Sequence, residues 1–301
     1  MKKISFFSYK GGAGRSTLAI NVVPYLADKL GATPETPLIL VDMDIDSCGI
    51  TFYFDIQNHK YIDDYSVQSL FGSNGSIPTD DDDTPIQEHR LFGHLCPVGD
   101  WFDKDPRTIL CLPAKPDAQL GAGSNYDSPE LLSKMNEFVR LCDEYNCCGI
   151  LFDSAVGDQL TAIGSNNCAD DIVCVMRPTK QFREGTDRFL NNLDRHVEDK
   201  KIIVVPNVVP TEPLSLEDRD GVHSYPKYAK EKIIESFNDN LDRGNNRYDM
   251  SMLDGDLFGV PKIDRFMWQE GILRTVKSGL TQLEVVALKR YEHIAEIICK
   301  D

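Results

Sequence analysis

The sequence predicts an α/β fold in which a doubly wound, mostly parallel sheet carries helices on both faces. Runs of residues that are almost entirely apolar, rather than alternating with polar residues, are typical of parallel strands buried on both faces. Helical patterns lie between most of these runs, so the ligand site is expected at the carboxyl ends of the strands. The runs are residues 4–8, 38–42, 108–113, 149–153, 172–177 and 202–206.

A glycine-rich segment follows the first run and opens onto a helical pattern over residues 16–30. Residues 10–17 read Lys-Gly-Gly-Ala-Gly-Arg-Ser-Thr, here named the phosphate loop. Glycines let successive backbone N–H groups point at an anion, and the start of a helix adds a partial positive charge. Ser16 stands where a hydroxyl at the first helical turn ligates Mg²⁺. The segment therefore predicts a site for nucleotide phosphates and magnesium.

The phosphate loop departs from the standard pattern G-x-x-x-x-G-K-[ST], because Tyr9 and Arg15 stand where that pattern has glycine and lysine. A lysine instead precedes the glycine pair, at Lys10. In this the segment resembles the deviant Walker A loop, K-G-G-x-G-K-[ST], of the ParA/MinD superfamily, which are P-loop NTPases of the SIMIBI class. Arg15 keeps the charge of the family's second lysine but is a planar fork. Nucleotide binding is expected, and the rate of hydrolysis is left open.

The resemblance also implies a dimer that sandwiches the nucleotide, in which Lys10 reaches the phosphates bound to the facing subunit. A lysine at that position has a simpler alternative, which is an ion pair with a surface acid. Lys10 is therefore both a candidate catalytic residue and a candidate for dimerisation that depends on nucleotide.

Two further strands end in acids where this family has them. The run 38–42 continues to Asp44, which matches the acid that lies near the attacking water. The run 149–153 ends at Asp153, which matches the Walker B aspartate that holds Mg²⁺ through water. The family continues D-T-P-P-G after that aspartate, whereas residues 153–157 read Asp-Ser-Ala-Val-Gly. Strand-end acids alone are weak evidence, since aspartate suits turns, and the order of the three motifs strengthens the assignment.

Asn207 follows the last long strand, where the family often recognises the adenine or its ribose; the alternative is an ordinary turn residue. With it, the candidate site is complete. Asp44 and Lys10 are the candidate catalytic residues, and Ser16 and Asp153 are the candidate metal ligands. The candidate nucleotide-binding residues are Lys10, Gly11, Gly12, Ala13, Gly14, Arg15, Ser16, Thr17 and Asn207.

Other helices follow from spacing and caps. A helix over 129–145 is expected, with Ser128 as its cap, Pro129 in its first turn and a face of apolar residues. Pro24 should remove a hydrogen bond from the helix over 16–30 or kink it. A helix is also expected near 226–237, and a short strand at 260–263. The amphipathic pattern of residues 283–298 carries several acids, which favours a packing helix over a membrane-binding one.

The 301 residues are expected to form a single domain over 1–301, with a surface insertion at 55–107. The insertion includes four consecutive acids, residues 80–83, that lack the spacing of a calcium loop and are expected in a solvated loop. The adjacent pair Trp101 and Phe102 is expected to anchor the segment or to meet a partner.

Charge and cysteine content limit the function classes. A formal net charge of −16 makes non-specific DNA binding unfavourable, because that binding relies on excess lysine and arginine. No apolar stretch is long enough to span a membrane, no secretory signal is expected, and nine cysteines without framework spacing indicate free thiols in the cytoplasm.

The sequence therefore favours an ATP-binding, Mg²⁺-dependent ATPase that dimerises around nucleotide and acts as a switch for an unidentified partner protein. The alternative is a nucleotide-binding interaction module with little or no hydrolysis, which Arg15 and the missing prolines favour. Plasmid or chromosome partition, positioning of a large complex, and a role in defence or mobile-element maintenance remain open as the biological process.

Overall fold

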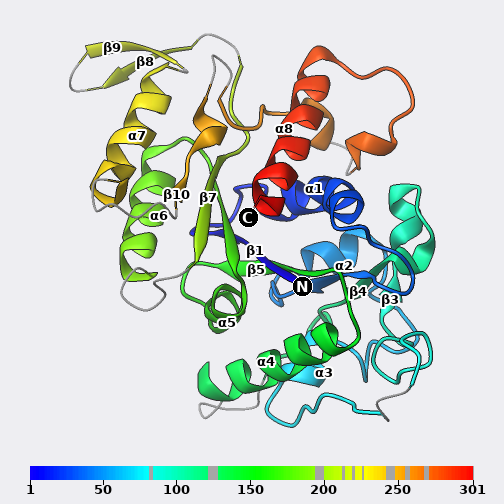
Figure 1. The fold of residues 1–301 in the computed structure, drawn as a ribbon. Coiled ribbons are helices and arrows are strands. Elements are labelled where there is room, and N and C mark those ends of the chain that lie inside the picture. The colour runs from blue at the N-terminus through cyan, green and yellow to red at the C-terminus, as the bar shows by residue number, and fades with distance from the viewer. Residues whose placement is uncertain are drawn as a thin grey trace.

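The computed structural model describes residues 1–80, 84–120, 128–193, 200–211, 214–218, 221–225, 227–241, 248–254, 258–267 and 271–300. The strands of the main sheet are β1 (Lys2–Ser8), β2 (Leu38–Asp42), β3 (Cys96–Pro97), β4 (Ile109–Leu112), β5 (Gly149–Val156), β6 (Asp171–Met176), β7 (Lys201–Pro206) and β10 (Tyr248–Asp249). Among the described residues they form one eight-stranded sheet in the order β10-β7-β6-β1-β5-β2-β4-β3 (Figure 1). Each of the six apolar runs that predict a strand is confirmed.

The order of the strands brings the candidate residues to one edge of the sheet. β1 pairs in parallel with β5 on one side and β6 on the other, and β2 pairs in parallel with β5 and β4. Only β3 runs antiparallel to its neighbour in the described part of the sheet. Asp42 at the end of β2 lies in register with Asp153 of β5. The phosphate loop follows β1, so it lies at the same edge as both acid-bearing loops.

Helices cover both faces of the sheet, as predicted. Helix α1 (Arg15–Lys29) packs against α8 (Gln282–Cys299) on one face, and α4 (Ser128–Glu144) packs against α5 (Leu160–Cys168) on the other (Figure 1). Helices α6 (Lys180–Leu193) and α7 (Lys227–Leu241) pack together beside β7. Pro24 is buried inside α1, which runs unbroken from residue 15 to residue 29.

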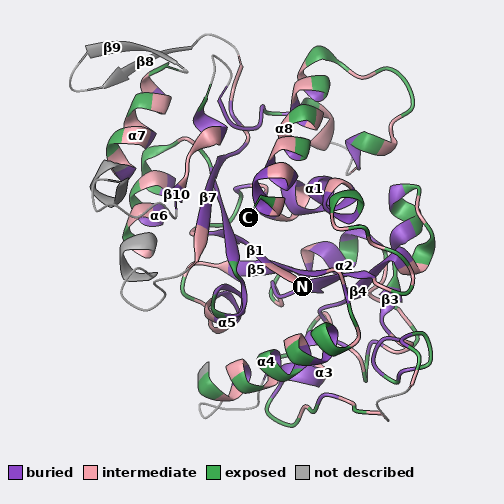
Figure 2. Ribbon diagram, in the orientation of Figure 1, coloured by how far each residue is buried: buried purple, intermediate pink, exposed green. Residues whose placement is uncertain are grey.

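Alternate strand residues enter two separate cores, which explains why the runs are apolar throughout. Leu38 and Leu40 of β2 join the core beneath α1 and α8, whereas Ile39 and Val41 join the core beneath α4. Figure 2 shows buried strands between helices whose outer faces are exposed. Helix α8 buries Tyr291 and neighbouring apolar residues, which agrees with a packing role. Among the described residues, no helix combines the length and the apolar character needed to cross a membrane.

The segment 55–107 contributes apolar side chains to both cores. It includes the short helix α3 (Val67–Phe71), whose Phe71 packs edge-on against Phe138 of α4. Phe102, in the 3₁₀ helix η1 (Gly99–Phe102), is buried, while Trp101 beside it is 44% exposed. Phe102 thus anchors the segment. Of the acid run, residues 81–83 lie outside the described residues.

Several small elements were absent from the sequence-based prediction. They include the helix α2 (Gly49–Tyr53), the hairpin of β8 (Leu214–Asp218) and β9 (Gly221–Tyr225), and the two-residue strands β3 and β10. Elements this short carry too few residues for a periodic pattern. Residues 260–263 form a single parallel bridge, from Val209 to Pro261, in place of the expected strand.

Candidate functional site

The phosphate loop adopts a backbone conformation that its glycines make possible. Gly12 and Gly14 have φ angles of 81° and 74°, in the left-handed region that side chains disfavour. Gly14 is the N-cap residue of α1, which begins at Arg15. The loop therefore delivers the chain directly to a helix N-terminus, where anions are favoured.

A pocket of about 480 Å³ opens over this loop. That volume lies within the range typical of small-molecule sites, about 300–1,000 Å³. The phosphate loop contributes the residues from Gly11 to Thr17, and the loops after β2 and β5 contribute the opposite wall. The opposite wall includes Asp44, Asp46, Ser47, Val156 and Gln159. Most of the candidate residues are thus gathered at one pocket.

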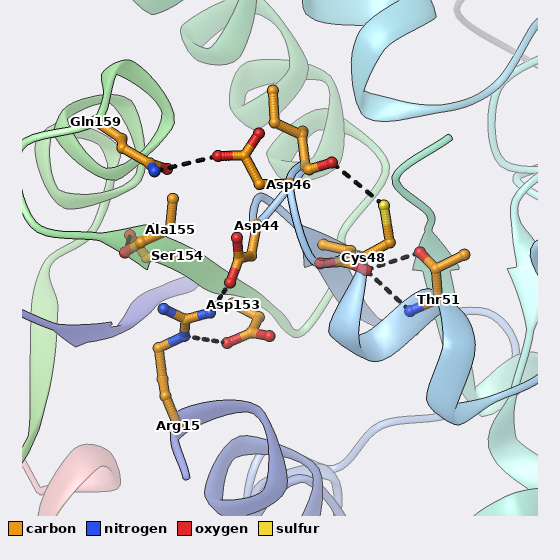
Figure 3. Close-up of polar contacts among 11 residues, drawn as sticks. Arg15, Asp44, Asp46, Cys48, Thr51, Asp153, Ser154, Ala155 and Gln159 are labelled. Atoms are coloured by element: carbon orange, nitrogen blue, oxygen red, sulfur yellow. Dashed lines mark hydrogen bonds and ion pairs between the residues drawn. The ribbon is translucent and has the colours of Figure 1, made fainter. Parts of the chain in front are cut away.

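Arg15 points away from the helix that it begins and lies between two acids (Figure 3). Its Nε donates to Asp153 Oδ1 at 2.7 Å, and its Nη2 donates to Asp44 Oδ2 at 2.6 Å. Burial by itself lowers the pKa of Arg15, but the carboxylates of Asp153 and Asp44 outweigh it and raise that pKa above its ordinary value. Arg15 therefore stays charged and reduces the repulsion between the two acids.

Asp153 and Ser16 offer oxygen atoms of the kind that Mg²⁺ prefers. Asp153 is fully buried, and burial raises its pKa, while Arg15 and the hydroxyl of Ser16 lower it, with a net increase. Its Oδ2 has no hydrogen-bond partner among the described residues. Beside the Ser16 hydroxyl lies Gly49, where a Cβ would come within 3.1 Å of Oγ. An unsatisfied carboxylate oxygen next to an uncrowded hydroxyl fits a hydrated magnesium ion.

Asp42 and Asp44 are distinguished by their surroundings. Asp42 is fully buried, and its Oδ2 accepts hydrogen bonds from the backbone N and the Oγ1 of Thr51, at 2.9 and 2.7 Å. Burial, and then the charge of Asp153, raise the pKa of Asp42 to about 7. Asp42 therefore holds the start of α2, whereas the side chain of Asp44 lines the pocket.

Lys10 lies outside the pocket wall. Its side chain is exposed, and its Nζ donates to Oε1 of Gln181, at the start of α6, at 2.8 Å. The partner of Lys10 is therefore a neutral amide, whereas the alternative interpretation of Lys10 expected an ion pair with a surface acid. The role of Lys10 at a facing subunit stays a prediction.

Asn207 lies beneath the phosphate loop. Its side-chain amide donates to the carbonyl oxygens of Ala13 and Gly14, at 2.8 and 3.2 Å. It is buried, with 6% of its surface exposed. Its role in base recognition stays a prediction.

The turn after Asp153 keeps its glycine in a special conformation. Gly157 has a φ of 64°, and its N–H donates to the carbonyl of Ser8 at 3.1 Å. This contact ties the turn to the strand that precedes the phosphate loop.

Asp46 and Gln159 are among the residues of the pocket wall that sequence reasoning missed. Gln159 Nε2 lies 3.2 Å from Asp46 Oδ2, so the pair joins the loops after β2 and β5 at the pocket (Figure 3). Neither residue belongs to a motif. Each residue follows closely after an acid at the end of a predicted strand, and the two strands, β2 and β5, are neighbours in the sheet. That position could have identified both residues.

Comparison with known proteins finds similarity in structure alone. No model of a protein family matches the chain, and no curated protein matches its sequence. Among solved structures, the MinD cell division protein of Aquifex aeolicus superposes with a TM-score of 0.58 at 17% identity, over 99% of this chain and 97% of that one. A plasmid partition protein from Borrelia burgdorferi, bound to AMPPNP, gives 0.58 at 18% identity, over 98% and 97%. Apo McdA of Cyanothece gives 0.62 at 14% identity, over 100% of both chains. The chain therefore has the MinD/ParA P-loop NTPase fold.

Proposed function

We propose that this chain, built on the fold of MinD and the plasmid partition proteins, is an ATP-binding, Mg²⁺-dependent ATPase that works as a nucleotide-controlled switch. The observation that carries the proposal is that the glycines of the phosphate loop, Arg15 and Asp44 line one pocket, while Arg15 also pairs with the buried Asp153. The AMPPNP bound to the Borrelia partition protein supports the choice of ligand. Together these features suit a nucleoside triphosphate.

Each residue has a role that follows from its contacts. The phosphate loop binds the phosphates through its backbone N–H groups and the start of α1. Ser16 and Asp153 would hold a magnesium ion with its water shell, which would supply positive charge beside the phosphate oxygens. Asp44, at the pocket wall, orients the attacking water. Catalysis then consists of positioning and charge stabilisation, without a covalent intermediate.

Arg15 links nucleotide binding to whether Asp44 and Asp153 are free to contact water and metal. In the described state its guanidinium occupies one oxygen of Asp44 and one of Asp153. Phosphates in the pocket offer an alternative anion for the same cation, and a turn of Arg15 toward them frees both acids for water and metal. A chain in which Arg15 stayed on the acids would bind nucleotide without turning it over. That is the second candidate function, an interaction module with little or no hydrolysis.

Dimerisation around the nucleotide is proposed from Lys10. Two copies of a chain with 48 acidic and 32 basic residues repel each other, so cations brought to shared phosphates would favour the dimer. Lys10 is exposed beside the loop and able to leave its neutral partner, Gln181. The same acidity supports a protein rather than DNA as the partner, in partition or in positioning of a cargo.

Phosphate release measured beside nucleotide binding tests the proposal. Wild-type chain with ATP and Mg²⁺ should release phosphate, slowly without a partner. Ser16→Ala should weaken the Mg²⁺ dependence of ATP binding, while Ser73→Ala, at an exposed serine, should change nothing. Binding without any phosphate release, even with candidate partners present, would favour the interaction module. Absence of binding would contradict both functions.

A further inference from the structure

We propose that Asn207 is a positioning residue of the phosphate loop, which sets the affinity for phosphates rather than for the base. This inference rests on the proposed function, because it assumes that the loop binds phosphates. It gives Asn207 a role that does not depend on which nucleoside is attached to them.

The side chain of Asn207 is committed to the loop. Its two N–H groups have two acceptors, the carbonyl oxygens of Ala13 at 2.8 Å and of Gly14 at 3.2 Å. The opposite orientation of the amide would set its oxygen against two other oxygens, so these contacts fix the orientation. Its backbone N–H donates to the carbonyl of Met176, at the end of β6, at 2.8 Å. Asn207 therefore connects the loop to the sheet.

Holding these two carbonyls also directs two N–H groups. In a planar trans peptide the C=O and the following N–H point in opposite directions. The carbonyl of Ala13 shares its peptide with the N–H of Gly14, and the carbonyl of Gly14 shares its peptide with the N–H of Arg15. The carbonyl of Gly14 also accepts from the N–H of Leu18 at 2.9 Å, so the start of α1 helps to orient it. Because Asn207 draws the carbonyl of Ala13 to its own side of the loop, it turns the N–H of Gly14 to the other side. All three loop residues line the pocket there.

The contact between the Asn207 amide and the phosphate loop is close, and the backbone on either side of it is constrained. A Cβ on Gly14, whose φ is 74°, would lie 2.9 Å from Asn207 Nδ2. The next residue, Val208, has a φ of 55°, a left-handed conformation that is strained for a β-branched side chain. The N–H of the following residue, Val209, donates to the carbonyl of Val260 at 3.0 Å. Strained backbone persists where surrounding contacts over-determine it, and here those contacts place the Asn207 amide against the loop.

Two probes separate phosphate positioning from base recognition: ATP, and inorganic triphosphate, which has no base. Affinities of both are measured with Mg²⁺ for wild type, Asn207→Ala and a control, Asn167→Ala. Asn167 lies on α5, where its amide also donates to a backbone carbonyl, that of Ile163, away from the phosphate loop. We expect Asn207→Ala to weaken both probes by the same factor, about tenfold for the loss of these hydrogen bonds. Asn207→Asp should weaken both further, because a carboxylate would face two carbonyl oxygens.

A loss of affinity for ATP alone, with triphosphate unchanged, would overturn the proposal in favour of a base contact. Unchanged affinity for both probes would overturn it as well. Circular dichroism and the unfolding midpoint without ligand verify that the variants fold. Should Asn207→Ala unfold, Asn207→Asp, which keeps the size of the side chain, serves as the test and should weaken both probes equally. If the wild-type chain binds neither probe, the proposed function itself is contradicted. If wild type binds both probes and Asn207→Ala binds them equally well, only the role of Asn207 is contradicted.

Discussion

The guanidinium of Arg15 forms a buried ion pair with the carboxylate of Asp44, with Nη2 and Oδ2 2.6 Å apart. The same guanidinium reaches Asp153, so a single cation serves an acid of β5 and an acid that lies just after β2. A lysine, with one compact ammonium, lacks the fork that spans both. Arginine at this position is therefore suited to a resting state in which one cation holds the two acids together.

Removing this cation should destabilise the fold. Arg15→Ala leaves two acids near each other without their partner, and the loss of one member of a buried ion pair costs about 3–5 kcal/mol. Equilibrium urea unfolding gives the free energy. Arg140→Ala removes an exposed arginine from its i,i+4 pair with Glu144, and should cost less than about 1 kcal/mol. Equal costs in the two variants would contradict a structural role for the Arg15 pairs.

Asp44 should be separable from nucleotide binding. Asp44→Asn removes the charge that orients water but leaves the phosphate loop and Asp153 in place. We expect ATP to bind within a few-fold of wild type and hydrolysis to fall by at least about a hundredfold, the scale of general-base or positioning effects. Single-turnover phosphate release measures this. A variant that hydrolyses ATP at the wild-type rate would exclude Asp44 from the site.

The stability of the fold should depend on pH through Asp42. Its pKa of about 7 exceeds that of an unfolded aspartate, about 4, so the folded chain binds the proton more tightly. This contribution is fully present below about pH 4 and is lost as the pH rises to about 7. Between pH 5 and pH 8, wild type should lose on the order of 2 kcal/mol relative to Asp42→Asn.

Urea unfolding of both proteins at the two pH values checks this expectation. The charged groups that face Asp42 are Asp153 and Asp44, which both proteins retain, so the difference between the proteins reports mainly on position 42. A difference that stays constant with pH would show that Asp42 titrates alike in the folded and unfolded chain.

Lys10 should control self-association but not binding. Sedimentation with a non-hydrolysable ATP analogue should show a tighter wild-type dimer than without it, and Lys10→Ala should abolish that tightening. Lys180→Ala is the matched control, because Lys180 lies next to Gln181 and pairs only loosely with Glu184, at 3.6 Å. The same mass for wild type with and without analogue would leave Lys10 as a surface residue.

Much of the fold could be predicted from the sequence, because the central strands of the sheet are buried on both faces and are therefore largely apolar. Leu38 to Val41 illustrate this, since alternate side chains enter different cores. The phosphate loop was predicted because its glycines and its place between strand and helix are local properties. The identity of the partners of Arg15 was not, since Asp44 and Asp153 come within its reach only through the order β1-β5-β2.

Contacts between residues that are far apart in the sequence could not be predicted from local sequence patterns either. Asn207 meets Ala13 across almost two hundred residues, and Gln159 meets Asp46 through the pairing of β5 with β2. The hairpin β8–β9 lies in a stretch rich in acids and asparagine, whose composition suggests a loop. Pairing between strands, rather than residue preference, decides such elements.

The most direct test of the central claim, that the phosphate loop binds ATP with Mg²⁺, is the melting temperature of wild-type chain during a nucleotide titration. Ligand at a hundred times its Kd adds about 2.7 kcal/mol to stability, which raises the Tm of a chain this size by several degrees. We predict such a rise with millimolar ATP and Mg²⁺, and a smaller one when the metal is chelated. An unchanged Tm with both ATP and ADP at millimolar concentration would contradict the claim.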